Sequence, residues 1–354
     1  MSLNPEVDAL LQSYVSDLTS LIIDQITKNL RFLPENERSK ELLEALKEAV
    51  TGGKRLRAQM AFAGTLICDY PDRGRALRLG AALELYQASA LIHDDIIDNA
   101  DTRRGRPSAH RSLREPLAGA LSLENADHYG RSAALLLGDL ALSTADRIAW
   151  ELSPHLDFGE LWTRMTASVA YGQYLDLYAE TGVEQITPVK ATEIATYKAA
   201  RYSVVDPLLL GVSLAGGGYE LRHSLNAAFE PIGVAFQFRD DLLGVFGEEE
   251  TIGKPAGADL AAGKRTILIA EALERGNSKE QDFINSHLGQ ANLAVSELAV
   301  LRDILIRSGA RQAVENRIEL LYQRGMKELE FAHLNDFSRG LLTHLANILV
   351  SRDS

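Results

Sequence analysis

The chain has 354 residues and a formal net charge of −12, with 46% hydrophobic and 24% charged residues. This is an ordinary globular composition, and it excludes a disordered chain, a collagen-like fibre and a disulfide scaffold. The acidic balance argues against broad binding to nucleic acid or anionic membranes, because those partners select basic surfaces. The single cysteine, Cys68, and the lack of a basic-then-apolar leader predict a reducing, cytoplasmic setting.

Helical spacing dominates the chain from its beginning. Apolar residues recur at three and four positions over residues 10–26, as on one face of a helix. A helix predicted from about residue 74 to residue 98 is apolar on every side, which is typical of the centre of a bundle. A second helix of this kind is predicted over residues 229–246.

No series of short alternating strands with hairpin turns is present, so the pattern predicts an all-α fold. Glycine and proline interrupt the helices at residues 51–54, 103–107, 215–219 and 253–264, but none of these segments resembles a linker. We therefore expect one domain over residues 1–354, with a few disordered residues at the N-terminus. Trp150 and Trp162 are expected in the core.

Two short basic segments stand out in this acidic chain, GGKRLRA at residues 52–58 and RRGR at residues 103–106. Arginine and lysine in such groups suit a compact anionic ligand such as a phosphate ester. The alternative is that both segments are solvated surface.

Both apolar helices end in aspartates, Asp94, Asp95 and Asp98 on the first and Asp240 and Asp241 on the second. A helix C-terminus already carries partial negative charge, so these carboxylates need a compensating cation. Mg²⁺ binds one or two carboxylates together with waters and substrate phosphates. Two such clusters across a cavity could hold one diphosphate between them. The loop patterns of EF-hand, Rossmann and P-loop sites are absent.

These segments together resemble the trans-prenyl diphosphate synthases of the polyprenyl synthetase family, most closely its geranylgeranyl diphosphate synthases. The likeness runs from GGKRLRA through LIHDDIIDNADTRRGRPSAH to FQFRDDLLGVFGEEETIGKPAGADLAAGKRT. The resemblance implies one large helical bundle of the isoprenoid synthase type around a central cavity. It also implies a homodimer that condenses isopentenyl diphosphate with an allylic diphosphate.

The resemblance further implies a role for each matching residue. Three Mg²⁺ ions would bind the allylic diphosphate, two of them through Asp94 and Asp98 and one through Asp240, within the metal set Asp94, Asp95, Asp98, Asp176, Asp240 and Asp241. The allylic side would also include Arg103, Gln173, Lys198, Lys254 and Lys264. Isopentenyl diphosphate would lie against Lys54, Arg57, Gln87 and Arg104. The residues implied in catalysis are Lys198, Gln237, Asp94 and Asp240.

Two positions depart from the family's pattern. Gly244 stands where many members carry the third aspartate of the second motif, and we expect this to be tolerated because the first aspartate is the implied metal ligand. Ala199 follows Lys198 where threonine or serine is common, which removes a hydroxyl near the reacting cation.

The residues before Asp94 bear on the length of the product. Ser89 and Ala90 are small where farnesyl diphosphate synthases tend to carry aromatics, whereas Tyr86, one turn deeper, presents a ring. Three residues rise by about 4.5 Å, roughly one isoprene unit, so Tyr86 predicts a twenty-carbon product. The alternative is that these residues are ordinary packing and another helix sets the length.

Other functions stay open at this point. A farnesyl or longer-chain synthase differs only in the length of its product. A class I terpene cyclase needs one diphosphate pocket, whereas Lys54, Arg57 and Arg104 indicate a second one. A non-catalytic partner subunit has no need of both acidic clusters. His93, beside Asp94, is interpreted as a packing residue rather than a metal ligand.

Overall fold

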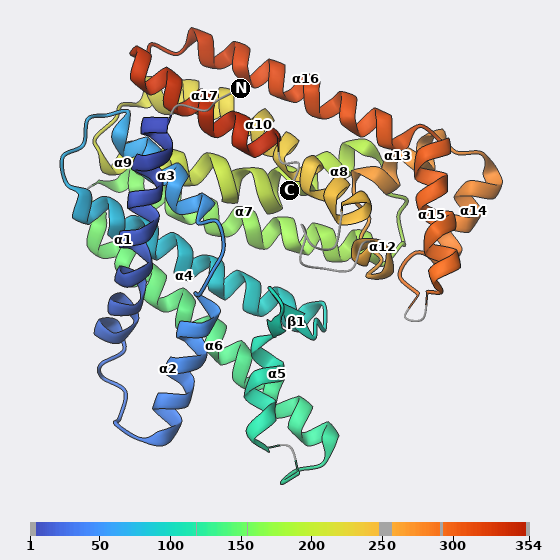
Figure 1. The fold of residues 1–354 in the computed structure, drawn as a ribbon, viewed down its shortest axis with the longest axis horizontal. Coiled ribbons are helices and arrows are strands. Elements are labelled where there is room, and N and C mark those ends of the chain that lie inside the picture. Colours follow the sequence, from blue (N-terminus) through green and yellow to red (C-terminus); the bar gives the residue numbers. More distant parts are fainter. Residues whose placement is uncertain (1–4, 118, 154, 248–256, 291–292, 352–354) are drawn as a thin grey trace. The chain divides into compact units, whose positions relative to one another are not determined.

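The computed structural model describes residues 5–117, 119–153, 155–247, 257–290 and 293–351 (Figure 1). The predicted disorder at the N-terminus falls on residues 1–4 and Lys254 falls within residues 248–256, so both lie outside the described residues. The described part is almost entirely helical, which confirms the all-α prediction. Within it, no helix is both long enough and apolar enough to cross a membrane.

Backbone contacts divide the chain into two compact units. The first unit is Met1–Glu160 with Leu210–Gly216, and the second is Leu161–Leu209 with Gly217–Ser354. The single domain over residues 1–354 stays a prediction.

The elements begin and end as follows along the first part of the chain: α1 (Pro5–Asn29), α2 (Glu37–Ala49), α3 (Leu56–Leu66), α4 (Arg73–Ile97), β1 (Thr102–Arg103), β2 (Arg106–Pro107), α5 (Ala109–Arg114), the 3₁₀ turn η1 (Glu115–Leu117) and α6 (Leu123–Leu152). The remaining elements are α7 (Leu156–Glu180), α8 (Pro188–Ala195), the π-helix η2 (Thr196–Val205), α9 (Asp206–Leu214), α10 (Tyr219–Phe246), α12 (Ala258–Ala261), α13 (Ile267–Arg275), α14 (Ser278–His287), α15 (Val295–Arg307), α16 (Ala310–Phe331) and α17 (Asp336–Val350).

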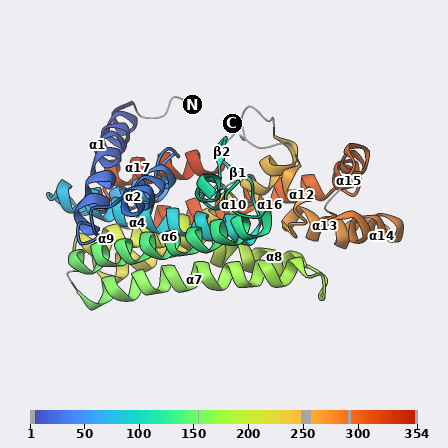
Figure 2. The same ribbon diagram turned by 90° about the horizontal axis from the view of Figure 1, so that it is seen from below.

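The first unit is built around α4, which lies beside α6 along much of its length (Figures 1 and 2). A Cβ atom added at Gly138 of α6 would lie 2.2 Å from Nε2 of His93 on α4, so this glycine lets the two helices approach. Nε2 of His93 is 3.3 Å from the Leu135 carbonyl oxygen, as expected of a packing residue. Helix α4 begins and ends within one residue of the bounds predicted from the sequence.

In the second unit α10 lies beside α16, and Gly325 of α16 allows the approach because a Cβ there would lie 2.5 Å from the Ala228 carbonyl oxygen. Next to this pair, the fully buried carboxylate of Glu271 on α13 accepts from Arg275 Nε at 2.7 Å and Arg317 Nε at 2.6 Å. Buried carboxylates require partners of this kind.

One core prediction is wrong. Trp162 is buried in α7, but Trp150 of α6 is 79% exposed. The buried positions of α6 near its end are Ile148, Ala149 and Leu152, and Trp150 points away from them on the outer face of the helix. Hydrophobicity alone did not indicate which face of α6 a tryptophan occupies.

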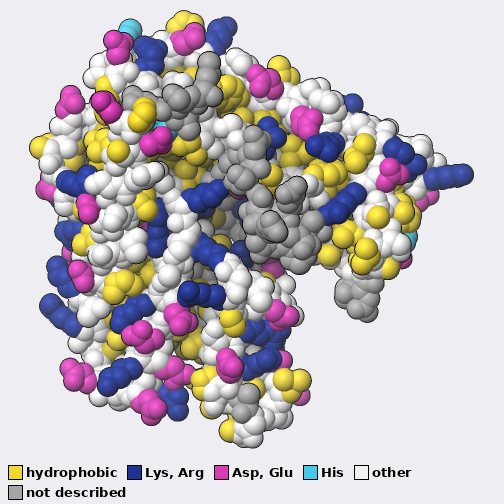
Figure 3. All heavy atoms as spheres, viewed as in Figure 1, with side chains coloured by type: hydrophobic (Ala, Val, Ile, Leu, Met, Phe, Trp, Pro, Cys, Tyr) yellow, Lys and Arg dark blue, Asp and Glu magenta, His cyan; other side chains and the backbone are white. Residues whose placement is uncertain are grey.

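Acidic and basic side chains are interspersed over the face drawn in Figure 3. The net charge of −12 is therefore not gathered into one acidic patch on that face.

Candidate active site

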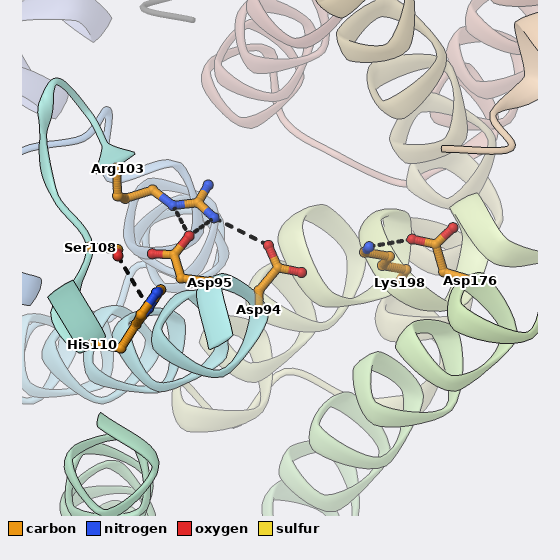
Figure 4. Close-up of polar contacts among 7 residues, drawn as sticks. All are labelled: Asp94, Asp95, Arg103, Ser108, His110, Asp176 and Lys198. Carbon is orange, nitrogen blue, oxygen red and sulfur yellow. Dashed lines mark hydrogen bonds and ion pairs between the residues drawn. The ribbon is translucent and has the colours of Figure 1, made fainter. Parts of the chain in front are cut away.

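The first acidic cluster lies at the C-terminal end of α4, in the first unit. Asp94 and Asp95 are in the last turn and Asp98 is the C-cap residue, its backbone N–H bonded to the Asp94 carbonyl at 2.8 Å. Arg103 donates from Nε to Asp95 Oδ1 at 2.9 Å, also contacts Asp95 through a second nitrogen, and reaches Asp94 Oδ2 at 3.3 Å (Figure 4). A guanidinium thus compensates the carboxylates that crowd this helix end.

The pKa of Arg103 depends on its burial and on the three carboxylates beside it. Burial by itself lowers the pKa of a guanidinium, but the hydrogen bond to Asp95 and the charges of Asp95, Asp94 and Asp98 outweigh it and raise the pKa of Arg103. Arg103 therefore stays charged beside all three carboxylates that the sequence indicated.

A hairpin that the sequence analysis did not predict brings Arg103 to this place. Strands β1 and β2 pair antiparallel, with Arg103 opposite Arg106. Both turn residues have positive φ, +54° at Arg104 and +73° at Gly105, as in the tight turns that join two short strands. The Arg-Gly pair gave no strong hairpin signal, and strands of two residues are too short to show alternation.

The two basic segments meet at one cavity. Arg104 donates from a terminal nitrogen to the Thr51 carbonyl at 2.9 Å, and a Cβ at Gly53 would lie 2.8 Å from its other terminal nitrogen. The cavity has a volume of about 760 Å³. Its walls come from α2, α4, α5, the hairpin and the 51–53 loop, and they consist of Ala45, Glu48, Ala49, Thr51, Gly52, Gly53, Ala88, Leu91, Ile92, Asp95, Arg103, Arg104, Arg106, Pro107, Ser108, Ala109 and Ser112.

The other predicted ligands of isopentenyl diphosphate lie near these walls in the chain. Lys54 follows Gly53 and is exposed, Arg57 is in the first turn of α3, and Gln87 is half-buried on α4 one residue before Ala88. The pKa of Arg104 is lowered, first by burial and then by the charges of Arg55, Arg103 and Arg57. The charge of Glu84 opposes this shift. The site is therefore strongly basic on this side.

The second acidic cluster belongs to the second unit. Asp240 and Asp241 lie on α10, and Gln237 donates to Asp241 Oδ1 at 2.7 Å. Burial raises the pKa of Asp241 to about 7, with further contributions from the charges of Asp259, Asp240 and Asp176 and an opposing hydrogen bond from Gln237. Carboxylates from α7, α10 and α12 thus repel one another here.

Lys198 pairs with Asp176 in this unit, Nζ to Oδ2 at 2.5 Å (Figure 4). Lys198 lies on the π-helix η2, and Gly172, one turn before Asp176 on α7, allows the contact because a Cβ there would lie 2.2 Å from the Lys198 backbone nitrogen. Gln173 follows on α7 and is half-buried. Lys264 donates from its backbone nitrogen to the Asp259 carbonyl at 3.0 Å. Ala199, which follows Lys198, has a buried methyl group.

The carboxylate oxygens of the two aspartate clusters are ligands of the type that Mg²⁺ binds. Among the described residues, no group of three or more His, Cys, Asp or Glu side chains already converges as a metal cage. Mg²⁺ does not need such a cage, because it keeps waters and takes the oxygens of a substrate phosphate. Burial first, and then the charges of the neighbouring carboxylates, raise the pKa of Asp241, so a cation bound here would stabilise its charged form.

The residues predicted to set the chain length lie on α4 above Asp94. Ala90 is half-buried, on the same side of the helix as Asp94, while Tyr86 and Ser89 are buried. Their effect on the product stays a prediction.

Sequence reasoning missed two acidic residues. Glu84 is 5% exposed on α4 and pairs with Arg55, and Asp259 on α12 extends the carboxylate group around Asp241. A signal for Glu84 was present, because a charged residue inside a helix that is apolar on every side needs a buried partner.

Comparison with known proteins agrees with this geometry. The family model described as polyprenyl synthetase matches residues 39–305. A short chain isoprenyl diphosphate synthase of Methanothermobacter thermautotrophicus is 30% identical over 88% of this chain and 90% of its own length. A geranylfarnesyl diphosphate synthase of Aeropyrum pernix is 27% identical over 97% of this chain and 99% of its own length.

A solved structure of geranylgeranyl pyrophosphate synthase from Corynebacterium glutamicum, complexed with isoprenyl diphosphate and magnesium, is also similar. It has 33% sequence identity and a TM-score of 0.87, and the match covers 95% of this chain and 98% of that one. With both acidic helix ends and the arginine-lined cavity in place, the chain belongs to the polyprenyl synthetase family and is a prenyltransferase of the trans-prenyl diphosphate synthase type.

Proposed function

We propose that this enzyme condenses isopentenyl diphosphate head-to-tail with allylic diphosphates and makes geranylgeranyl diphosphate as its main product. One observation carries the proposal. At the end of α4, a cluster of aspartates suited to metal ions adjoins a cavity lined by Arg103, Arg104 and Arg106. A cation-binding group for one diphosphate thus lies beside a basic pocket for another.

The residues support the reaction as follows. Arg103, Lys198 and Lys264 place positive charge at the allylic diphosphate, where negative charge develops as the C–O bond ionises. Arg104, with Lys54 and Arg57, holds the diphosphate of isopentenyl diphosphate so that its alkene faces the allylic cation. The alkene attacks, and the departing diphosphate accepts the proton that the product loses.

We further propose that three Mg²⁺ ions take part, bound through Asp94, Asp98 and Asp240. When bound, the ions supply Lewis-acid stabilisation of the leaving diphosphate. The magnesium in the similar C. glutamicum structure supports the choice of metal ion. In this chain Arg103, which lies 3.3 Å from Asp94, would turn its guanidinium to the bound diphosphate.

The twenty-carbon length rests on α4. Ala90 offers little obstruction beneath Asp94, and the buried ring of Tyr86 lies four residues deeper. Tyr86→Ala should therefore shift the products to longer chains, and Ser89→Phe should shorten them. An unchanged distribution in both variants would show that another helix sets the length.

A homodimer is also part of the proposal, supported by exposed apolar side chains on α6 and α7. On α6, Leu136 and Trp150 face solvent. On α7, Tyr171, Tyr174 and Tyr178 share one exposed face. Soluble monomers rarely expose aromatic rows of this kind, and tyrosine is enriched at protein interfaces.

The activity is tested by incubating the purified protein with Mg²⁺, isopentenyl diphosphate and, separately, the five-, ten- and fifteen-carbon allylic diphosphates. The products are dephosphorylated and sized by chromatography. We expect geranylgeraniol, and its loss on chelation. Farnesol or longer prenols would support the condensation reaction but contradict the twenty-carbon product. Cyclic hydrocarbons would indicate a terpene cyclase, and turnover only with an added subunit would indicate a non-catalytic partner.

A further inference from the structure

Helix α4 carries two buried carboxylates on one face, Glu84 and Asp95, and each binds an arginine from a different segment of the chain. The two residues are separated by about three helical turns, or roughly 16 Å. Asp95 holds Arg103 of the hairpin. Glu84 holds Arg55, which belongs to the loop between α2 and α3. This helix face thus fixes the spacing between the two basic segments.

The pair of Glu84 and Arg55 is nearly closed to solvent. Arg55 donates to Glu84 Oε2 at 3.0 Å, with side chains that are 5% and 6% exposed. A second terminal nitrogen of Arg55 donates to the Val50 carbonyl at 2.5 Å. Because burying two charges loses much of their hydration, such pairs are weak evidence for stability and are better explained by a positional role.

The backbone of this loop needs to be held. Gly52 and Gly53 have φ of +79° and +87°, and Arg55, which carries a Cβ, has φ of +53°. A residue other than glycine keeps a left-handed conformation only when its surroundings fix it. The two hydrogen bonds of the Arg55 guanidinium, to Glu84 and to Val50, provide that constraint.

The same loop forms one wall of the cavity. Thr51, Gly52 and Gly53 line it, and the Thr51 carbonyl accepts the hydrogen bond from Arg104. Lys54 lies between Gly53 and Arg55, with its carbonyl bonded to Gln59 Nε2 at 2.6 Å. Burial and the charges of Arg55, Arg103 and Arg57 lower the pKa of Arg104, and the charge of Glu84 opposes this. Moving Arg55 would therefore move Lys54 and the backbone contact of Arg104 together.

We propose that Glu84 is a positioning residue for the diphosphate of the second substrate. Acting through Arg55, it holds the 51–55 loop in its left-handed conformation and so places Lys54, Gly53 and Arg104 around isopentenyl diphosphate. This inference rests on the proposed function, because that function assigns the basic cavity to isopentenyl diphosphate.

The test measures substrate binding apart from turnover. Glu84→Gln keeps the shape of the side chain and removes its charge, and Arg55→Lys keeps the charge and removes the planar fork. Isopentenyl diphosphate is titrated calorimetrically into each protein without Mg²⁺. We expect its Kd to rise about tenfold or more in both variants, the scale of one lost charge-assisted contact. The KM of the allylic diphosphate, measured with Mg²⁺, should stay within about twofold.

Glu271→Gln is the matched control, because Glu271 is another buried carboxylate bound to arginine, in its case to both Arg275 and Arg317. It should lower the midpoint of urea unfolding while leaving the Kd of isopentenyl diphosphate unchanged. If Glu84→Gln does not fold, Arg55→Lys decides the question.

The outcomes separate this inference from the proposed function. Wild-type protein that makes no prenyl diphosphate overturns both. Wild-type activity with unchanged isopentenyl diphosphate binding in Glu84→Gln and Arg55→Lys overturns the positioning role alone. An equal loss of affinity for both substrates, as in a general loss of structure, also contradicts it.

Discussion

Gly244 of α10 has a structural counterpart in Asp259. A Cβ at position 244 would lie 2.1 Å from Oδ2 of Asp259, and the Gly257 backbone N–H bonds the Gly244 carbonyl at 3.1 Å. The carboxylate of Asp259 thus occupies the space that a side chain at position 244 would need. A neighbouring acid thus lies beside the position at which the sequence departs from the family's second motif.

Restoring the motif should therefore harm this enzyme. Gly244→Asp makes the side chain of Asp259 turn aside and adds a like charge beside it, so we expect a loss of about 1 kcal/mol in the free energy of unfolding. Urea denaturation of the metal-free protein measures it. The double variant Gly244→Asp with Asp259→Gly should recover most of the loss, because the space is then vacated. Full stability of the single variant would contradict the clash.

At the scale of elements, the sequence predicted the long apolar helices best. Helix α4 was placed within one residue at each end, and in the structure Asp72 is its N-cap and Asp98 its C-cap residue. Helix α10 begins at Tyr219, ten residues before the predicted start at Phe229, since residues 219–228 are mixed rather than apolar on every side. The rule that found the centre of the helix could not find its amphipathic beginning.

The parts of the site that the sequence did not predict depend on contacts between elements. The aspartates and arginines were recognisable from their spacing, but the pairing of Arg103 with Asp95 needs the hairpin. The contact of Lys198 with Asp176 needs the π-helix η2 and the close approach at Gly172. Because π-helices are rare and occur mostly as single turns inside α-helices, residues 196–205 gave no reason to expect one.

The junction of η2 and α9 carries a buried acid with an unusual titration. Asp206 is fully buried and pairs with Arg164, while its Oδ2 has no hydrogen-bond partner among the described residues. Burial raises the pKa of Asp206 to about 6, although the charge and hydrogen bond of Arg164 oppose this. The folded protein therefore favours the protonated acid more than the unfolded chain does.

This shift has a definite sign for stability. Below about pH 4 Asp206 is protonated in both states, so it adds no pH dependence there. As pH rises toward 6 the unfolded chain loses the proton first, and the folded state becomes less stable relative to it. Asp206→Asn should gain stability relative to wild type between pH 4 and pH 7, by about 2 kcal/mol. Urea unfolding at both pH values measures the difference, and a constant difference would contradict the raised pKa.

At the scale of the whole molecule, the exposed row on α7 calls for a partner surface. Tyr174 is 64% exposed, with Tyr171 and Tyr178 on the same face and the small residues Ala167 and Ala170 beside them. The α6 side chains Leu136 and Trp150 are likewise exposed in the first unit. In a two-fold dimer, a self-complementary apolar patch covers itself. A second copy of the chain is therefore the occupant that we expect.

Light scattering after size exclusion should give about twice the chain mass of 38.8 kDa for the wild type. Tyr174→Asp places a charge in the middle of the aromatic row, and burying that charge against a second copy would cost several kcal/mol, so the variant should elute as a monomer. Phe331→Asp is the control, because Phe331 on α16 is equally exposed but stands apart from this row, and the variant should stay dimeric. A monomeric wild type would remove the dimer from the proposal. If Tyr174→Asp remains a dimer, the α7 face lies outside the interface, and the same change at Trp150 then tests the face of α6.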